Sequence, residues 1–215
     1  MIKRIESEQD MARAAKHLKN ADPILAAIIK DTERYRLKRG ASHFEFLVGT
    51  VVSQLLSTKA AATIFGRLKT ALNGQPFNHQ AMAKISDDQI LSAGLSRAKL
   101  KCIRTICTAL ETGELSFRKL SRMEDGPAMD YMTAIKGIGP WTARIFLMFD
   151  LKRADLFAAG DKGLETAIYL LYGTGKKKLD LEKIAAPWSP YRTVACWYLW
   201  RHLHSVRAEK AKLGD

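Results

Sequence analysis

A short glycine-rich break between two apolar helical patterns constrains this sequence more than any other feature. Apolar residues recur at helical spacing over 129–135, the pattern stops at Gly137 and Gly139, and a second apolar run follows over 141–149. Both glycines permit positive φ, so the chain can reverse within a few residues. Pro140 then suits the first position of a new helix. The sequence therefore predicts two helices joined by a tight hairpin.

The second of these helices begins at the hairpin, where its first N–H groups are unpaired and its dipole is positive. Glycines beside those amides let another backbone come close, which makes the hairpin a candidate anion site with phosphate as its natural ligand. A plain corner between two helices explains a bare Gly-x-Gly about equally well. The rest of the chain has to decide between the two.

Charge favours the first interpretation. Lys and Arg number 35 against 22 Asp and Glu, which gives a net charge of +13 and a pI near 9.8. Such a surplus attracts a polyanion, most often nucleic acid, although a basic surface without a ligand remains the alternative. No apolar run has the length of a signal peptide or a membrane span. We expect an intracellular, DNA-associated, monomeric protein with no membrane contact.

Helical patterns and helix-capping residues fill nearly the whole chain. Candidate N-caps are Ser7, Asp22, Ser42, Ser57, Asn78, Ser86, Ser96, Asp161 and Ser189. A capping box at Ser42–Glu45 predicts a helix that continues to Leu56, and the last long helix is predicted over 191–206. The three cysteines, Cys102, Cys107 and Cys196, lie in apolar helical contexts and are predicted to be buried. The predicted class is all-α, since no alternating strand pattern stands out.

Five blocks of the sequence carry a resemblance to a known family: Ser53–Ala61, Gly94–Lys99, Ile135–Ala143, Asp161, and Trp188–Arg192 leading to Trp200. They resemble the helix-hairpin-helix (HhH-GPD) DNA glycosylase superfamily, and within it the alkylbase or 3-methyladenine DNA glycosylase II group. They occur in the family's order, which is more specific than any one of them. The resemblance implies two helical subdomains with the active cleft between them. The central one would span 42–155, with the hairpin at 129–149, and the second would combine 1–41 with 156–215.

The resemblance also implies the parts that an enzyme needs to take one base out of a duplex. DNA-phosphate binding is expected at Lys136, Gly137, Ile138, Gly139, Trp141 and Thr142, and a base pocket at Trp141 and Trp200. Leu55 would be the wedge that fills the gap, because a leucine replaces stacking contacts without needing hydrogen bonds. In relatives the hairpin carbonyls hold Na⁺ or K⁺, here those of Thr133, Ile135 and Ile138. The alternative for Leu55 is a place in the hydrophobic core, which is the commoner role of a leucine on a helix.

Asp161 is the predicted catalytic residue. A carboxylate beside the deoxyribose would stabilise the positive charge that develops at the anomeric carbon and could orient a water. Aspartate is also a preferred N-cap residue, so capping alone would account for its place before Lys162. Bifunctional relatives carry a lysine nucleophile where this chain has Trp141, so hydrolysis without strand cleavage is expected. Relatives with an iron–sulfur cluster need four clustered cysteines, so no cofactor is expected beyond the hairpin cation.

The expected reaction is hydrolysis of the N-glycosidic bond of alkylated purines, such as 3-methyladenine and 7-methylguanine, in duplex DNA during base excision repair. An alkylated purine is cationic and is attracted to the faces of aromatic rings. Ala159-Gly160 and Ile145 depart from residues found in some relatives, which leaves base specificity open. The alternatives are a glycosylase for uracil or other deaminated or oxidised bases, and a non-catalytic module that binds DNA and flips bases. A purely structural all-α protein leaves the charge unexplained.

Overall fold

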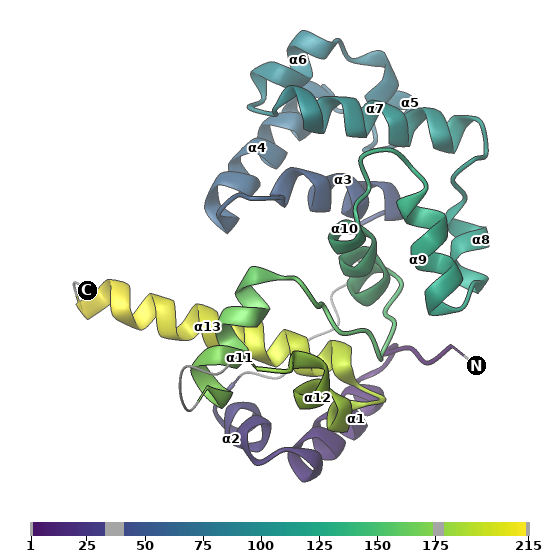
Figure 1. Cartoon of the computed structure of the whole chain (residues 1–215). Coiled ribbons are helices and arrows are strands. Elements are labelled where there is room, and N and C mark those ends of the chain that lie inside the picture. Colours follow the sequence, from purple (N-terminus) through teal and green to yellow (C-terminus); the bar gives the residue numbers. More distant parts are fainter. Residues whose placement is uncertain (1, 33–40, 174–178, 214–215) are drawn as a thin grey trace. The chain divides into compact units, whose positions relative to one another are not determined.

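Helices are the regular elements of the structure, a computed structural model that describes residues 2–32, 41–173 and 179–213. Among these residues the only β-type pairing is an isolated antiparallel bridge between Arg4 and Arg153. The predicted all-α class is therefore confirmed. The chain forms two compact units, one of Arg39–Leu151 and one of Met1–Lys38 with Lys152–Asp215 (Figure 1). The three consecutive lysines at 176–178 lie outside the described residues. None of the described helices is long and apolar enough to cross a membrane.

The unit Arg39–Leu151 is built around α3. Its helices are α3 (His43–Ser53), α4 (Thr58–Ala71), α5 (His79–Lys84), α6 (Asp87–Ser92), α7 (Arg97–Glu111), α8 (Phe117–Arg122), α9 (Asp125–Thr133), α10 (Pro140–Ile145) and the π-helical η1 (Phe146–Asp150). α3 packs against α4, α7, α10 and η1. Leu47 and Val51 of α3 are fully buried, as are Ile103 and Ile106 of α7. Burying one such side chain stabilises the fold by about 1.5–3 kcal/mol.

Most of the predicted helix starts are confirmed by capping hydrogen bonds. Side chains of Ser42, Ser57, Asn78, Ser86 and Ser96 each accept a backbone N–H three residues further on. The capping box at Ser42 is only half formed, because Glu45 forms a salt bridge with Lys69 of α4 instead of returning to the cap. The predicted continuation of this helix to Leu56 is wrong, since α3 ends at Ser53.

The second unit packs around its C-terminal helix. Its helices are α1 (Glu8–Ala21), α2 (Pro23–Asp31), α11 (Lys162–Tyr172), α12 (Leu181–Ala185), the 3₁₀-helix η2 (Ala186–Trp188) and α13 (Arg192–Leu213). α13 packs against α1, α2 and α11. The buried Asp22 caps α2 and also accepts hydrogen bonds from the Tyr172 hydroxyl at 2.7 Å and the Trp188 indole at 2.8 Å. One carboxylate thereby joins α2, α11 and η2.

Candidate functional site

The predicted hairpin lies between α9 and α10. The Ile138 N–H donates to the Ile135 carbonyl at 3.0 Å and closes the turn, and Gly137 has φ +99°. Gly139, the N-cap of α10, has φ −85°. Of the two glycines that permit positive φ, only Gly137 adopts it, because one left-handed residue suffices to reverse the chain. The helix–hairpin–helix itself is as predicted.

Gly137 has a second constraint besides its backbone angle. A Cβ atom at this position would lie 2.8 Å from Sγ of Cys102 and 3.2 Å from its Cα, whereas one at Gly139 would meet nothing within 4 Å. The hairpin is therefore seated directly on α7, and only a residue without a side chain permits that approach. Burial raises the pKa of Cys102 to about 11, so this side chain is a neutral thiol at physiological pH.

The predicted phosphate-binding residues are brought together on this turn. Gly139 is the N-cap of α10 and has no side chain with which to cap the first N–H groups of the helix. Lys136 beside them is exposed and Trp141 is half-buried, whereas Thr142 is buried and its hydroxyl accepts a hydrogen bond from the Gln54 amide at 2.7 Å. The arrangement can hold a phosphate with backbone N–H donors and one point charge. Phosphate binding at these residues stays a prediction.

The carbonyls expected to hold a monovalent cation belong to the same turn. The Ile135 carbonyl already accepts the Ile138 N–H. A carbonyl oxygen has a second lone pair, so this bond leaves room for a cation. Oxygen ligands suit hard cations, and the predicted set at Thr133, Ile135 and Ile138 fits one on chemical grounds.

The residue predicted as the wedge stands out from the surface. Leu55 follows the end of α3, its relative exposure is 105%, and its φ is +57°. The alternative of a core leucine on a helix therefore does not hold. A positive φ at a residue with a side chain costs about 1–3 kcal/mol and persists only where the surroundings impose it. A fully exposed leucine in a strained backbone needs a reason other than stability of the fold.

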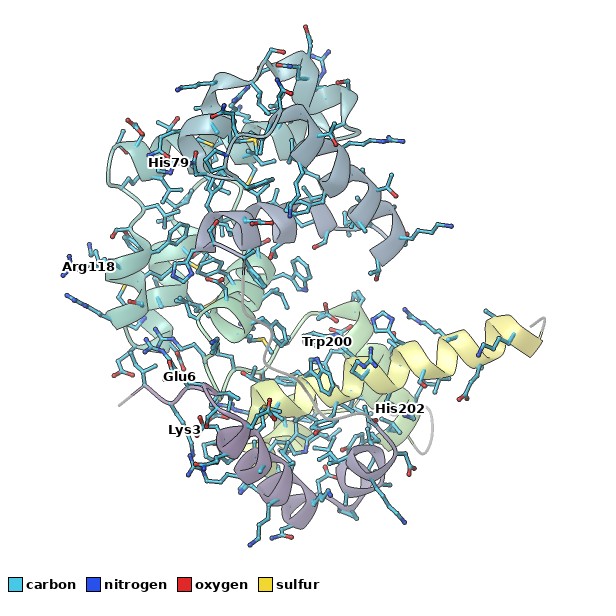
Figure 2. All side chains as sticks on the ribbon, turned by 180° about the vertical axis from the view of Figure 1, so that it is seen from behind. Lys3, Glu6, His79, Arg118, Trp200 and His202 are labelled. Carbon is cyan, nitrogen blue, oxygen red and sulfur yellow. The ribbon has the colours of Figure 1, made fainter. Side chains whose placement is uncertain are left out.

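The carboxylate of Asp161 is the N-cap of α11 and has a second partner. Its Oδ1 accepts the Leu164 N–H at 2.7 Å and the Trp200 indole N–H at 2.8 Å. Figure 2 shows Trp200 on α13 beside α11. A Cβ atom at Gly163 would lie 3.2 Å from Oδ1 and 3.6 Å from the Trp200 ring, so this glycine permits the close packing. The capping role and the predicted functional role are therefore compatible.

The other aromatic residues near Trp200 in the sequence differ in their burial. Trp188 of η2 is fully buried, and Tyr198 of α13 is buried as well. Trp197 is only half-buried and packs edge-on against Tyr198 with ring centroids 5.0 Å apart. The sequence does not reveal the Trp200–Asp161 hydrogen bond or the role of Gly163. Their only trace in the sequence is an aspartate followed two residues later by glycine at a helix start.

Comparison with known proteins identifies this arrangement. A family model described as HhH-GPD superfamily base excision DNA repair protein matches residues 48–190. The chain belongs to the HhH-GPD superfamily. The matched span contains the hairpin, Leu55 and Asp161, and it ends before Trp200. The predicted resemblance and the predicted fold are thus confirmed.

Individual HhH-GPD proteins are similar along most of their length. DNA-3-methyladenine glycosylase 1 of Schizosaccharomyces pombe is 30% identical over 198 residues, which cover 89% of this chain and 87% of the relative. A crystal structure of DNA-3-methyladenine glycosidase from Bacillus halodurans has a TM-score of 0.77 at 34% identity and covers 97% of this chain and 95% of that one. The S. pombe 3-methyladenine DNA glycosylase in complex with abasic DNA has a TM-score of 0.79 at 29% identity, covering 87% and 95%.

Proposed function

We propose that this HhH-GPD protein is a DNA glycosylase that hydrolyses the N-glycosidic bond of alkylated purines in duplex DNA, as a step of base excision repair. The observation that carries the proposal is the Asp161 carboxylate, held by the Trp200 indole N–H within a chain of this superfamily. The names of relatives support the proposal: similar proteins of S. pombe and Bacillus halodurans are named for 3-methyladenine, and the S. pombe protein was solved in complex with abasic DNA.

The chemistry proposed for Asp161 follows from its charge and its fixed orientation. As the glycosidic bond lengthens, positive charge develops on the sugar, and a nearby carboxylate stabilises it. Because the Leu164 N–H and the Trp200 indole both donate to Oδ1, the carboxylate cannot rotate freely. A fixed anion needs no reorganisation when the charge appears, which is the condition for effective electrostatic catalysis.

The remaining parts of the proposal concern substrate and product. In this proposal the rings of Trp141 and Trp200 would each contact a cationic alkylated base, because such a base is attracted to aromatic faces. Trp141 also stands where a lysine nucleophile would be needed for strand cleavage, so the proposed product is an intact abasic site. The hairpin would bind the DNA backbone, and Na⁺ or K⁺ at its carbonyls would add positive charge near a phosphate. The chain would act as a monomer on double-stranded DNA.

The proposal is tested by base release from duplex DNA treated with a methylating agent. Wild type should release 3-methyladenine or 7-methylguanine and leave the strand uncut. Asp161→Asn should bind the same duplex, and its rate of excision should fall by about 100-fold or more. Removing a group that stabilises charge in the transition state typically slows a reaction by this much. Asp180→Asn is the matched control, because Asp180 caps α12 in the same way as Asp161 caps α11. This control variant should excise bases at the wild-type rate.

Excision at a near-normal rate by Asp161→Asn would refute the catalytic assignment. Release from uracil-containing duplexes but not from methylated ones would replace the substrate class with the deaminated-base alternative. Duplex binding without release of any base would favour the non-catalytic flipping module. Strand breaks in the wild-type product would contradict the expected absence of lyase activity.

A further inference from the structure

Leu55 occupies a turn position that normally belongs to glycine. The Leu56 N–H donates to the Ser53 carbonyl at 3.2 Å, Gln54 has φ −52° and ψ 125°, and Leu55 has φ +57°. These angles define a type II β-turn, whose third residue is usually Gly or Asn because it needs positive φ. A leucine at this position is strained, so other contacts must hold the turn.

The orientation of one peptide group decides between this turn and an ordinary one. A type I turn over the same residues would rotate the Gln54–Leu55 peptide by roughly 150–170° and give Leu55 a φ of about −90°. The direction of the Gln54 carbonyl therefore decides how the Leu55 side chain is presented. A group that binds this carbonyl selects the type II turn.

Lys99 is such a group. Its ammonium nitrogen donates to the Gln54 carbonyl at 2.8 Å and to the Val52 carbonyl at 2.8 Å. A lysine in the first turn of α7 is opposed by the dipole of its own helix, but it is favourable near the last carbonyls of α3. Partial burial of the amine lowers the pKa of Lys99 below its ordinary value. The carbonyl groups at the end of α3 therefore explain why a lysine stands at this position of α7.

A second contact holds the same residue from the hairpin. The Gln54 side-chain amide donates to the hydroxyl of Thr142 in α10 at 2.7 Å. Thr142 is itself 1% exposed, so its hydroxyl is a fixed partner. Gln54 is thereby held through its carbonyl by α7 and through its amide by α10, and Leu55 projects from between these two attachments.

We propose that Lys99 is a positioning residue for base flipping: by binding the Gln54 carbonyl it selects the turn from which Leu55 can enter the gap left by an extruded base. The inference rests on the proposed function, and specifically on Leu55 as the wedge. Lys99 acts through Leu55 and contacts neither base nor sugar. The wedge thus depends on three residues, Gln54, Leu55 and Lys99. The strained turn that they form holds the Leu55 side chain in the orientation that flipping needs.

The test measures flipping separately from binding. The probe is a duplex with one 7-methylguanine beside 2-aminopurine, whose fluorescence rises as the neighbouring base leaves the stack. The variants are Lys99→Met, Leu55→Ala and the double variant, with Lys101→Met as the control that removes the same charge from an exposed position of α7. Lys99→Met should slow flipping by about ten-fold, the effect of a lost charged hydrogen bond. Its affinity for undamaged duplex should match that of Lys101→Met.

The double variant distinguishes positioning from general damage to the fold. If Lys99 acts through Leu55, adding Lys99→Met to Leu55→Ala should slow flipping no further. Normal flipping by Lys99→Met, or losses that add in the double variant, would overturn the inference. If Lys99→Met does not fold, Lys99→Gln, which keeps a shorter neutral donor, serves the same comparison.

Failure of the proposed function would look different. A wild-type protein that flips a base without releasing it removes the proposed hydrolysis and leaves this inference standing, whereas one that neither flips nor releases a base removes both. Normal flipping by Leu55→Ala removes the wedge and the inference but leaves the role of Asp161 standing. Slow flipping by Leu55→Ala together with normal flipping by Lys99→Met removes the inference alone.

Discussion

The carboxylate of Asp161 joins two helices through a single oxygen atom. Capping of α11 by the Leu164 N–H is a local contact three residues long, whereas the Trp200 indole comes from α13, 39 residues away in sequence. Hydrogen bonds to a charged group contribute about 1.5–3 kcal/mol each, about twice those between neutral groups. The second bond therefore restricts the carboxylate strongly enough to affect a reaction that depends on its position.

Trp200→Phe tests this restriction, because it keeps an aromatic ring and removes the indole N–H. Base release should slow by about 10- to 100-fold, the equivalent of one hydrogen bond to a charged group. Affinity for duplex should stay unchanged. Single-turnover excision measures the effect, with Trp197→Phe as the control on the neighbouring, half-buried position. Wild-type rates in Trp200→Phe would show that capping alone orients Asp161.

His43 is a second residue whose partner lies far away in sequence. Its Nδ1 lies 2.6 Å from Oδ2 of Asp150, which links the start of α3 to the end of η1. The hydrogen bond to Asp150 raises the pKa of His43 above its ordinary value, and burial only partly opposes this. The rings of Phe117 and Phe146 stack on each other and both pack beside the imidazole ring. Folding therefore favours the protonated form of His43, because that form is stabilised by Asp150 in the folded state.

The pH dependence follows from the direction of that shift. A raised pKa in the folded state gives stability that is complete below about pH 6.5, the ordinary value of histidine, and is lost as pH rises through the folded-state pKa. His43→Gln should therefore lower the melting temperature at pH 5.5 and have little effect at pH 9. The half-exposed ring limits the difference to about 1 kcal/mol. His204→Gln, at an exposed position, is the control, and a difference independent of pH would contradict the assignment.

At the scale of elements, the hairpin depends on one glycine more than on the other. Gly137 combines a φ of +99° with a close approach to Cys102, whereas Gly139 has an ordinary φ and open space around it. Of the two glycines that permit positive φ, only Gly137 therefore needs it. The conformation and close packing of Gly137 therefore set the position of the backbone that leads into α10.

Gly137→Ala should lower the free energy of unfolding by about 1–3 kcal/mol, because it adds strain at positive φ and a clash with α7. Duplex binding should weaken with it, since the hairpin would have to lift from α7. Gly139→Ala should change stability by less than about 0.5 kcal/mol. Denaturant unfolding and duplex titrations measure both variants. Equal stability of the two would contradict the seating of the hairpin on Cys102.

The turn after α3 shows where local patterns mislead. Apolar residues continue from Val51 to Leu56 at spacings that a helix allows, so the sequence predicts a helix to Leu56. The chain leaves the helix at Ser53 because Lys99 and Thr142, more than 40 residues away, hold Gln54 in a turn. No local propensity favours leucine at positive φ, so the sequence alone could not predict this turn.

At the scale of the whole molecule, the net charge of +13 predicts the salt dependence of DNA binding. Each phosphate neutralised by the protein contributes about −0.9 to the slope of log affinity against log salt. With six phosphate contacts, affinity for duplex should fall by about 1,000-fold between about 50 and 200 mM salt. Fluorescence anisotropy at several salt concentrations measures the slope. A flat profile would exclude duplex DNA as the main partner.

The sequence by itself determined the helical class, most helix starts, the hairpin and the family, because these depend on short-range features. Capping by Ser96 or Asp161 and the 3.6-residue periodicity act within a few residues. The sequence blocks that indicate the family are short and can be recognised without the structure. The roles inferred for individual site residues stay predictions. Only the tertiary structure decided that Gly137 carries the close approach, that Leu55 stands exposed and that Trp200 binds Asp161. Each of these depends on side chains from another helix, and such contacts arise from packing that no local pattern encodes.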